Sequence, residues 1–188
     1  MKIRIITFAT CIVLAVGGAT NAFAQNGSEM KDKKSDKYAK DVESLDSIVD
    51  ALYDSISGGA GVERDWDRFH NLFVEDARLI PTGKDQASGL LKAFSLSPAG
   101  YVERSGPFLV NNGFFEKEIA RKTETFGNIV HIFSTYEGRR KESDEKAFLR
   151  GINSIQLLND GKRWWIVTVY WQAESPDNPL PAKYLPAR

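Results

Sequence analysis

The chain has 188 residues, which is long enough for one domain with a sizeable hydrophobic core. Its 25 Lys and Arg side chains are matched by 25 Asp and Glu side chains, so no basic excess indicates a nucleic-acid-binding protein. The single cysteine, Cys11, excludes a disulfide framework, a zinc finger and an iron–sulfur cluster.

Residues 1–24 have the pattern of a secretory signal peptide. Lys2 and Arg4 form a charged start, residues 5–18 are apolar, and an A-x-A cleavage site lies at residues 22–24. An uncleaved membrane anchor is the alternative, but a span needs about 18 unbroken apolar residues. We therefore expect export to the periplasm or the cell exterior, with no stable membrane anchor after cleavage.

Three segments follow the predicted signal peptide. Residues 25–40 mix lysines with acids and contain few apolar residues, so they cannot offset their ordering entropy by burial. We expect a flexible polar linker there. Residues 41–174 contain the periodic apolar segments and should form one domain. Residues 175–188 contain four prolines, which favour an extended C-terminal tail.

Three helices are predicted in the first part of the domain. Asp41–Ser57 repeats apolar residues at helical spacing, with Asp41 as a plausible N-cap. Trp66–Val74 is a shorter helix that Asp65 should cap. The third helix starts with Ser and Pro at its cap and first position and spans residues 97–110.

Strands dominate the rest of the domain. Ala77–Pro81 is predicted to be a short edge strand, and Phe114–Phe126 turns into Ile129–Arg140. Phe148–Ala173 contains two further strands joined by Asp160-Gly161, a strong hairpin signal. Helices followed by a four-stranded antiparallel meander predict an α+β domain.

The last strand is apolar on both faces, which indicates that both faces are covered. Strict alternation divides its side chains into two sets, and the first contains Trp164, Ile166, Thr168, Tyr170 and Gln172. If Trp164 and Ile166 face the helices, the opposite set lies on a face that no other segment obviously covers, namely Trp165, Val167, Val169 and Trp171. We expect self-association through this second set in a two-fold homodimer, with coverage by the C-terminal tail as the alternative.

The element order, together with FVEDARLIP after the second helix and DGKRWWIV near the end, resembles the nuclear-transport-factor-two-like superfamily. This superfamily includes SnoaL-like polyketide cyclases and ketosteroid isomerases. The resemblance covers about residues 41–173. It implies a cystatin-like cone, in which a curved antiparallel sheet wraps around the N-terminal helices and leaves a pocket at its open end. Ketosteroid isomerases pair through this sheet face, which agrees with the expected homodimer.

The candidate catalytic residues are His70 and Asp67. The strand after the second helix, which carries the base in ketosteroid isomerases, has no carboxylate here. His70 shares a predicted inward helix face with Trp66 and Phe73, and Asp67 could fix its tautomer. Such a pair suits general-base catalysis, whereas a core-edge histidine bonded to a backbone carbonyl is the alternative. Two histidines without a matched spacing predict no metal site.

Two classes of function remain open from the sequence. The first is an exported, noncatalytic domain whose pocket binds a small apolar molecule. The second is a small cofactor-independent isomerase, cyclase or hydrolyase that uses the His70–Asp67 pair. The first is favoured, because no constellation of a carboxylate and hydrogen-bond donors stands out. The residues expected to line the pocket are Trp66, Phe73, Trp164, Thr168, Tyr170 and Asn153.

Overall fold

The computed structural model describes residues 37–186 of the chain. The chain divides into two compact units, and the unit that begins at Tyr38 is the domain described below. The predicted signal peptide and most of the predicted linker lie outside the described residues. Within the part that is described, every helix is too short or too polar to cross a membrane.

The packed domain begins at Tyr38, three residues before the predicted boundary. Tyr38 is only 6% exposed, and its hydroxyl lies 2.8 Å from both carboxylate oxygens of Asp65. A short 3-10 helix, η1 (Ala39–Val42), follows and buries Val42. The last residues of the predicted linker therefore belong to the domain.

The first two α-helices form nearly where the sequence predicts them. Helix α2 (Leu45–Ile56) is capped by Ser44, whose extended backbone lets its hydroxyl accept a backbone N–H, so the predicted cap Asp41 is wrong. Helix α3 (Trp66–Asn71) is capped by Asp65 as predicted. Its end lies three residues before the predicted end, because the chain already enters the sheet at Phe73.

Helix α4 (Pro98–Asn112) has the predicted start. The hydroxyl of Ser97 accepts a hydrogen bond of 3.1 Å from the backbone N–H of Gly100, and Pro98 occupies the first helical position. The helix ends at Gly113, whose φ of +67° is a conformation that other residues rarely adopt. A Cβ on Gly113 would also lie 2.7 Å from the carbonyl oxygen of Arg140.

The sheet is mixed and has six strands in the order β2-β1-β6-β5-β4-β3. All neighbouring strands are antiparallel except β1 and β6, which are parallel. The strands are β1 (Phe73–Lys84), β2 (Leu91–Ala93), β3 (Phe115–Phe126), β4 (Ile129–Arg139), β5 (Leu149–Asn159) and β6 (Trp164–Ala173).

Strand β1 differs from the predicted edge strand Ala77–Pro81 in length and in position. It has twelve residues and lies between β2 and β6, so it is not at an edge. Pro81 does not stop it, because its carbonyl still accepts a hydrogen bond of 3.1 Å from the N–H of Phe94. The predicted antiparallel meander is confirmed for β3 to β6, and β1 adds the parallel pair.

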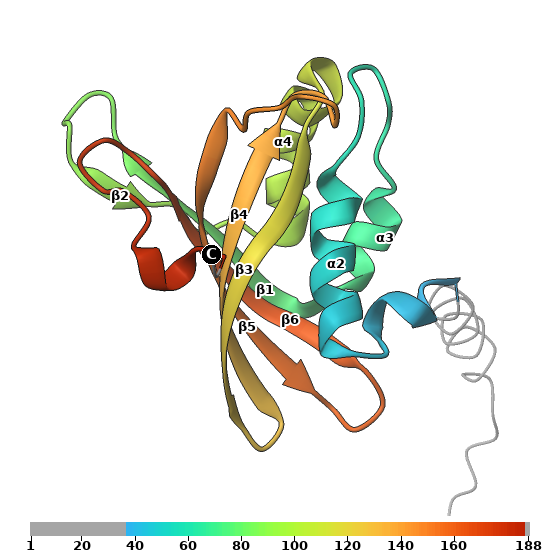
Figure 1. The fold of residues 1–188 in the computed structure, drawn as a ribbon. Helices are drawn as coiled ribbons and strands as arrows, with labels where there is room; N and C mark the ends of the chain where they lie inside the picture. The colour runs from blue at the N-terminus through green and yellow to red at the C-terminus, as the bar shows by residue number, and fades with distance from the viewer. Residues whose placement is uncertain (1–36, 187–188) are drawn as a thin grey trace, which may run out of the picture. The chain divides into compact units, whose positions relative to one another are not determined.

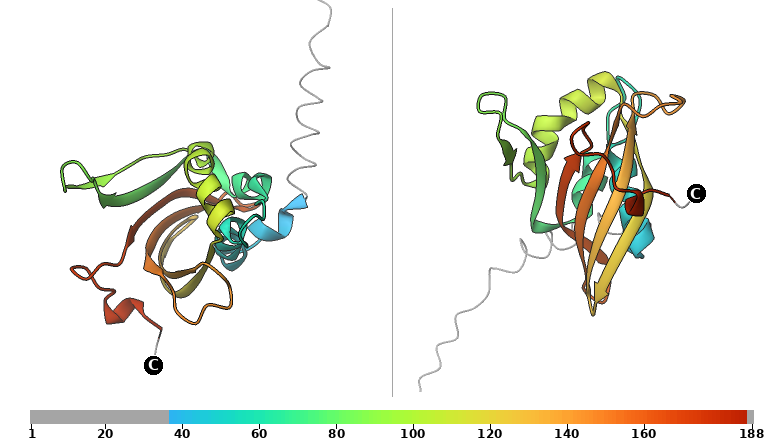
Figure 2. Two further views of the ribbon diagram at one scale, coloured as in Figure 1. Left: turned by 90° about the horizontal axis from the view of Figure 1, so that it is seen from above. Right: turned by 60° about the vertical axis from the view of Figure 1, so that its left-hand side comes forward.

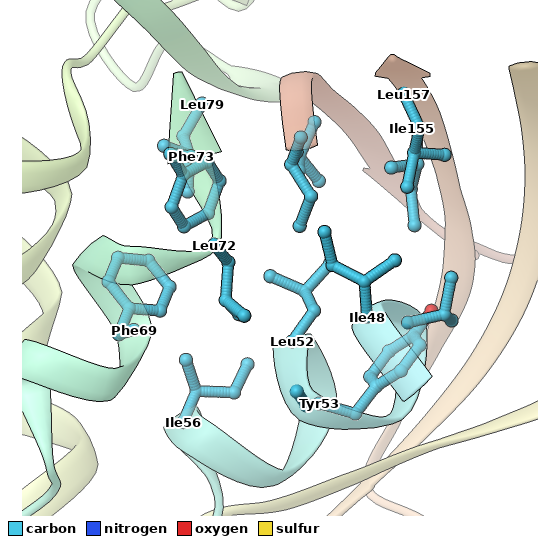
Figure 3. Close-up of a cluster of buried hydrophobic side chains, with 14 of the residues drawn as sticks. Ile48, Leu52, Tyr53, Ile56, Phe69, Leu72, Phe73, Leu79, Ile155 and Leu157 are labelled. Atoms are coloured by element: carbon cyan, nitrogen blue, oxygen red, sulfur yellow. The ribbon is translucent and has the colours of Figure 1, made fainter. Parts of the chain in front are cut away.

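The sheet curls so that its concave face holds the helices, as Figures 1 and 2 show. The core lies between this face and helices α2 and α3, and Figure 3 shows its central side chains. This arrangement confirms the predicted α+β cone. The labelled core residues come from both helices, from the residue between α3 and β1, and from strands β1 and β5: Ile48, Leu52, Tyr53, Ile56, Phe69, Leu72, Phe73, Leu79, Ile155 and Leu157.

A β-bulge in β6 changes which of its side chains face the helices. Gln156 of β5 pairs with Thr168, but the next residue, Leu157, pairs with Ile166, so Val167 is an extra residue. The alternation therefore reverses at Val167. Strict alternation predicted Ile166 and Val169 on opposite faces of the sheet. In the structure both face the core, and they are 0% and 5% exposed.

The reversal corrects the predicted dimer surface. Trp171 lies on the concave side with Val169, while Trp165 donates a hydrogen bond of 2.8 Å to Asp160 in its own hairpin. The guanidinium of Arg163 covers the Trp165 ring at 3.6 Å from its centroid. The four predicted side chains do not form one surface, and self-association itself stays a prediction.

The C-terminal segment passes over the convex face of the sheet. A second short 3-10 helix, η2 (Ala182–Tyr184), lies on the side opposite the helices, as Figure 2 shows. The ring of Tyr184 packs against Phe133 at 5.2 Å, and its carbonyl accepts a hydrogen bond of 2.6 Å from Thr135. Part of the convex face is thus covered by the predicted extended tail.

Arg64 joins the ends of two helices through backbone carbonyl groups. Arg64 is only 7% exposed. Its guanidinium donates hydrogen bonds to the carbonyls of Ile56 at 3.1 Å, Gly58 at 2.7 Å and Leu109 at 3.0 Å. Five N–H donors in a planar fork suit such a cluster of acceptors. The guanidinium therefore satisfies carbonyls that would otherwise be buried without partners.

Replacing Arg64 with Met should lower the free energy of unfolding by about 3–5 kcal/mol, because several buried carbonyls lose their donors. Urea denaturation followed by circular dichroism measures this change. Arg104→Met is the matched control, since Arg104 is exposed, and should change stability by less than about 0.5 kcal/mol. Equal stability of the two variants would contradict the structural role of Arg64.

Candidate functional site

A cavity of about 220 Å³ lies between the concave face of the sheet and the helices. One of its lining residues, Phe108 of α4, is 48% exposed, so the cavity is not sealed from solvent. Most of its lining is aliphatic or aromatic. The lining residues are Leu52, Tyr53, Ile56, Phe69, Leu79, Tyr101, Ser105, Phe108, Leu109, Phe114, Glu116, Tyr136, Leu149, Asn153, Val169 and Trp171.

Among the described residues that line the cavity, Glu116, near the start of β3, is the only one with a carboxyl group. The backbone N–H of Glu116 donates to the hydroxyl of Ser57 at 2.9 Å, which ties this residue to the end of α2. Its cross-strand neighbour is Gly138, which has no side chain to shield the carboxyl from the cavity. The amide of Asn153 donates to the carboxyl at 3.3 Å. Within residues 37–186, Glu116 forms no ion pair.

A chain of hydrogen bonds holds the polar side of the cavity. Asn153 also donates to the Tyr53 hydroxyl at 3.0 Å, and that hydroxyl lies 2.6 Å from the hydroxyl of Ser134. Ser134 in turn donates to the carboxylate of Glu118, which accepts a second bond from Arg121 at 2.5 Å. Tyr53 is therefore held in place from both sides, and Asn153 is fixed where it can reach Glu116.

Two further tyrosines present hydroxyl groups to the cavity. Tyr136 is only 2% exposed, and within the described residues its hydroxyl has no hydrogen-bond partner. A Cβ on Gly151 would lie 2.5 Å from this oxygen, so glycine is required at that position. Tyr101 stacks on Phe69 at 5.5 Å and meets the edge of Trp171 at 6.1 Å. Its hydroxyl also lacks a partner within residues 37–186.

Burial sets the protonation states in the cavity. Desolvation raises the pKa of Glu116 from its ordinary value of 4.5 to about 8, and the bond from Asn153 only partly opposes this shift. Burial likewise raises the pKa of Tyr53, Tyr101 and Tyr136, with the negative charge of Glu116 as a further cause. At neutral pH the carboxyl group is therefore largely protonated, and all three phenols are neutral.

The apolar lining of the cavity can contact an apolar molecule, and a few polar groups can orient that molecule. An apolar pocket with a small number of convergent polar groups is the usual form of a small-molecule site. Here those groups are the Glu116 carboxyl and the free hydroxyls of Tyr101 and Tyr136. Within residues 37–186, no three His, Cys, Asp or Glu side chains converge as metal ligands.

The predicted inward placement of His70 is wrong. His70 and Asp67 are both exposed, and neither lines the cavity. Helix α3 has fewer than two turns and buries Phe69 at 0% exposure, which leaves the next residue on the outer side. The ring of His70 contacts the Phe69 ring edge-on at 5.8 Å, between Phe69 and the solvent.

Of the six predicted pocket residues, only Asn153 lines the cavity. Phe73 is buried in the core, and Trp66 packs on α4, where a Cβ on Gly106 would lie 3.3 Å from its ring. Trp164 packs against the core. The two remaining residues lie on the convex face because the bulge at Val167 reverses the alternation: Thr168 and Tyr170.

Sequence reasoning missed Glu116, although a signal existed. In an alternating strand Glu116 shares a face with Phe114, a large apolar residue that is 6% exposed in the structure. Such a pair indicates a carboxyl group on the inner face. Tyr101 had no comparable signal, because the apolar residues of α4 do not form a clear stripe that would show which aromatic side chains face inward.

Replacing Glu116 with Gln should remove a pH dependence of stability. The pKa of Glu116 is raised in the folded state, so the folded protein holds this proton more tightly than the unfolded chain. Wild-type stability should therefore fall relative to the variant as pH rises from about 4.5 to about 8. The expected relative loss is about 1–3 kcal/mol, reduced because the carboxyl is partly open to solvent.

Urea denaturation at several pH values measures this difference between the two proteins. Glu142→Gln, at an exposed position, is the control and should follow the wild-type profile. Parallel profiles for wild type and Glu116→Gln would show that Glu116 titrates normally and that its carboxyl is not desolvated.

Comparisons with known proteins agree with the fold. No protein-family profile and no curated protein sequence matches the chain. A protein of unknown function from Nostoc punctiforme with a cystatin-like fold is 9% identical, with a TM-score of 0.52 over 73% of this chain and 92% of that one.

Two other solved structures are similar over nearly their whole length. An NTF2-like protein of unknown function from Silicibacter pomeroyi is 15% identical, with a TM-score of 0.48 over 74% of this chain and 98% of that one. A candidate ketosteroid isomerase from Parabacteroides distasonis is 13% identical, with a TM-score of 0.48 over 73% and 98%. Such low identities show the fold alone: the chain has the cystatin-like cone fold that its resemblance to NTF2-like proteins predicted.

Proposed function

We propose that this domain binds a small, largely apolar molecule in the cavity between the sheet and the helices. The observation that carries the proposal is the Tyr136 side chain, which is only 2% exposed as a residue, lines an otherwise apolar cavity and has a hydroxyl without a hydrogen-bond partner within residues 37–186. A hydrogen bond between this hydroxyl and a ligand contributes about 0.5–1.5 kcal/mol to binding. The exposure of Phe108, which lines the cavity, indicates that a ligand can enter without unfolding the domain.

The other sequence-based hypothesis, an enzyme using His70 with Asp67, has no support from the geometry, because both residues lie outside the cavity. Glu116 instead supplies a second candidate function. A carboxyl group whose pKa is near 8 can act as a general acid or base at neutral pH. Loss of carbon-bound hydrogen from a bound ligand into deuterated water, present in wild type and absent in Glu116→Gln, would establish proton transfer.

Export to the periplasm or the cell exterior remains part of the proposal. Its support is the charged start, apolar segment and A-x-A site within residues 1–24. A ligand-binding domain in that location would meet molecules that enter from outside the cell.

Filling the cavity should abolish binding. Ser105 lines the cavity from α4, so Ser105→Trp places a large ring in the empty space. Ligand-observed saturation-transfer NMR with a panel of small aromatic fragments should detect binders of the wild type. Their affinity should fall at least about ten-fold in the variant, because ring and ligand compete for one volume.

Val62→Trp is the matched control, because Val62 is 55% exposed and lies outside the cavity. It adds the same ring and should leave fragment binding unchanged. Fragments that bind Ser105→Trp as well as wild type, or a wild type that binds none, would overturn the proposed function.

A further inference from the structure

The carboxyl group of Glu116 lacks a counter-ion. The described residues that line the cavity include no Lys, Arg or His. Within residues 37–186, the only donor to this carboxyl is the neutral amide of Asn153, at 3.3 Å. Buried carboxylates are normally paired with a cation or bonded by several donors. Glu116 therefore has unused capacity to accept hydrogen bonds from a positively charged group.

The charges around Glu116 do not supply the missing cation. Three tyrosines face it, Tyr53 of α2, Tyr101 of α4 and Tyr136 of β4. An outer groove shares Tyr53 and Glu116 with the cavity, and its charged residues are Asp50, Asp54, Lys117, Glu118, Arg139 and Glu142. Three of these charges are already paired within the protein: Asp54 with Arg68, Glu118 with Arg121 and Arg139 with Glu137.

The remaining charges in the groove give an acidic surplus. Asp50 and Glu142 have no ion pair within residues 37–186, and only Lys117 opposes them. Lys117 is exposed and alternates with Glu116 along β3, so it points away from the cavity. Ionised Glu116 would add to this surplus. A negative potential at the polar end of the cavity favours a cation over a neutral molecule or an anion.

The aromatic lining suits a cation with an apolar body. Aromatic side chains come from α2, α3, α4, β4 and β6 as well as from the residue before β3: Tyr53, Phe69, Tyr101, Phe108, Phe114, Tyr136 and Trp171. Their ring faces attract ammonium groups by about 0.5–2 kcal/mol each, most strongly in desolvated sites. The free oxygens of Tyr101 and Tyr136 can accept hydrogen bonds from the same ammonium group, which has three donors.

We propose that the ligand of this cavity is a small monocation, a primary amine whose ammonium group pairs with Glu116 while its apolar body lies among the aromatic side chains. The proposal rests on the proposed small-molecule function and names the chemical class of the ligand. Pairing with the ammonium ionises the carboxyl group. A protonated Glu116 then transfers its proton to solvent, so binding at neutral pH releases up to one proton for each amine bound.

Isothermal titration calorimetry with two matched pairs tests the proposal: benzylamine against benzyl alcohol, and phenethylamine against phenethyl alcohol. At neutral pH each amine should bind the wild-type protein at least about ten-fold more tightly than its alcohol. Titrations in two buffers with different ionisation enthalpies should show proton release for the amines only. Glu116→Gln should lose the preference and the proton release while still binding the alcohols.

Glu142→Gln is the control, because it removes an acidic charge from the outer groove without altering the cavity wall. It should retain most of the amine preference. Alcohols that bind as tightly as the amines, or a preference that survives in Glu116→Gln, would overturn the amine assignment and leave the proposed function intact. If neither class binds the wild type, the proposed function fails together with the inference.

Discussion

The bulge in β6 is the constraint on which the cavity depends. An extra residue at Val167 reverses the alternation of side chains, so that Ile166, Val169 and Trp171 all face the helices. Without the reversal, the buried wall of the cavity would consist of Thr168 and Tyr170. A bulge also bends its strand and increases the local twist, which suits a sheet that curls around helices. One irregular residue thus links the curvature of the sheet to the chemistry of its inner face.

The cavity combines two features that oppose each other energetically. Its aromatic walls reduce contact with water, and the resulting desolvation makes an ionised carboxyl group costly at Glu116. The side-chain amide of Asn153 donates one hydrogen bond to Glu116 and one to Tyr53, but no described residue that lines the cavity supplies a cation. The carboxyl group is therefore poised to change its charge when a partner arrives. The same carboxyl group therefore affects both the stability of the fold and the binding of a ligand.

The sequence predicted the fold better than the site, for physical reasons. Helix periodicity, the Asp65 cap and the Asp160-Gly161 turn are local signals, and they predicted the order of the α-helices and strands correctly apart from the short strand β2. The site depends on non-local facts: the register between β5 and β6, and the short helix that turns His70 outward. Only Asn153 was placed correctly in the cavity. Glu116 could have been found from its alternation with Phe114, but no pattern predicts a bulge.

Direct titration of the Glu116 carboxyl group tests the central claim, that a half-buried carboxyl without a counter-ion in the cavity is desolvated. Carbon-detected NMR of protein with labelled glutamate, assigned by comparison with Glu116→Gln, follows this one group as pH changes. The account predicts a midpoint near 8 in the free protein, which falls when an amine is bound. A midpoint near the ordinary value of 4.5 in the free protein would contradict it.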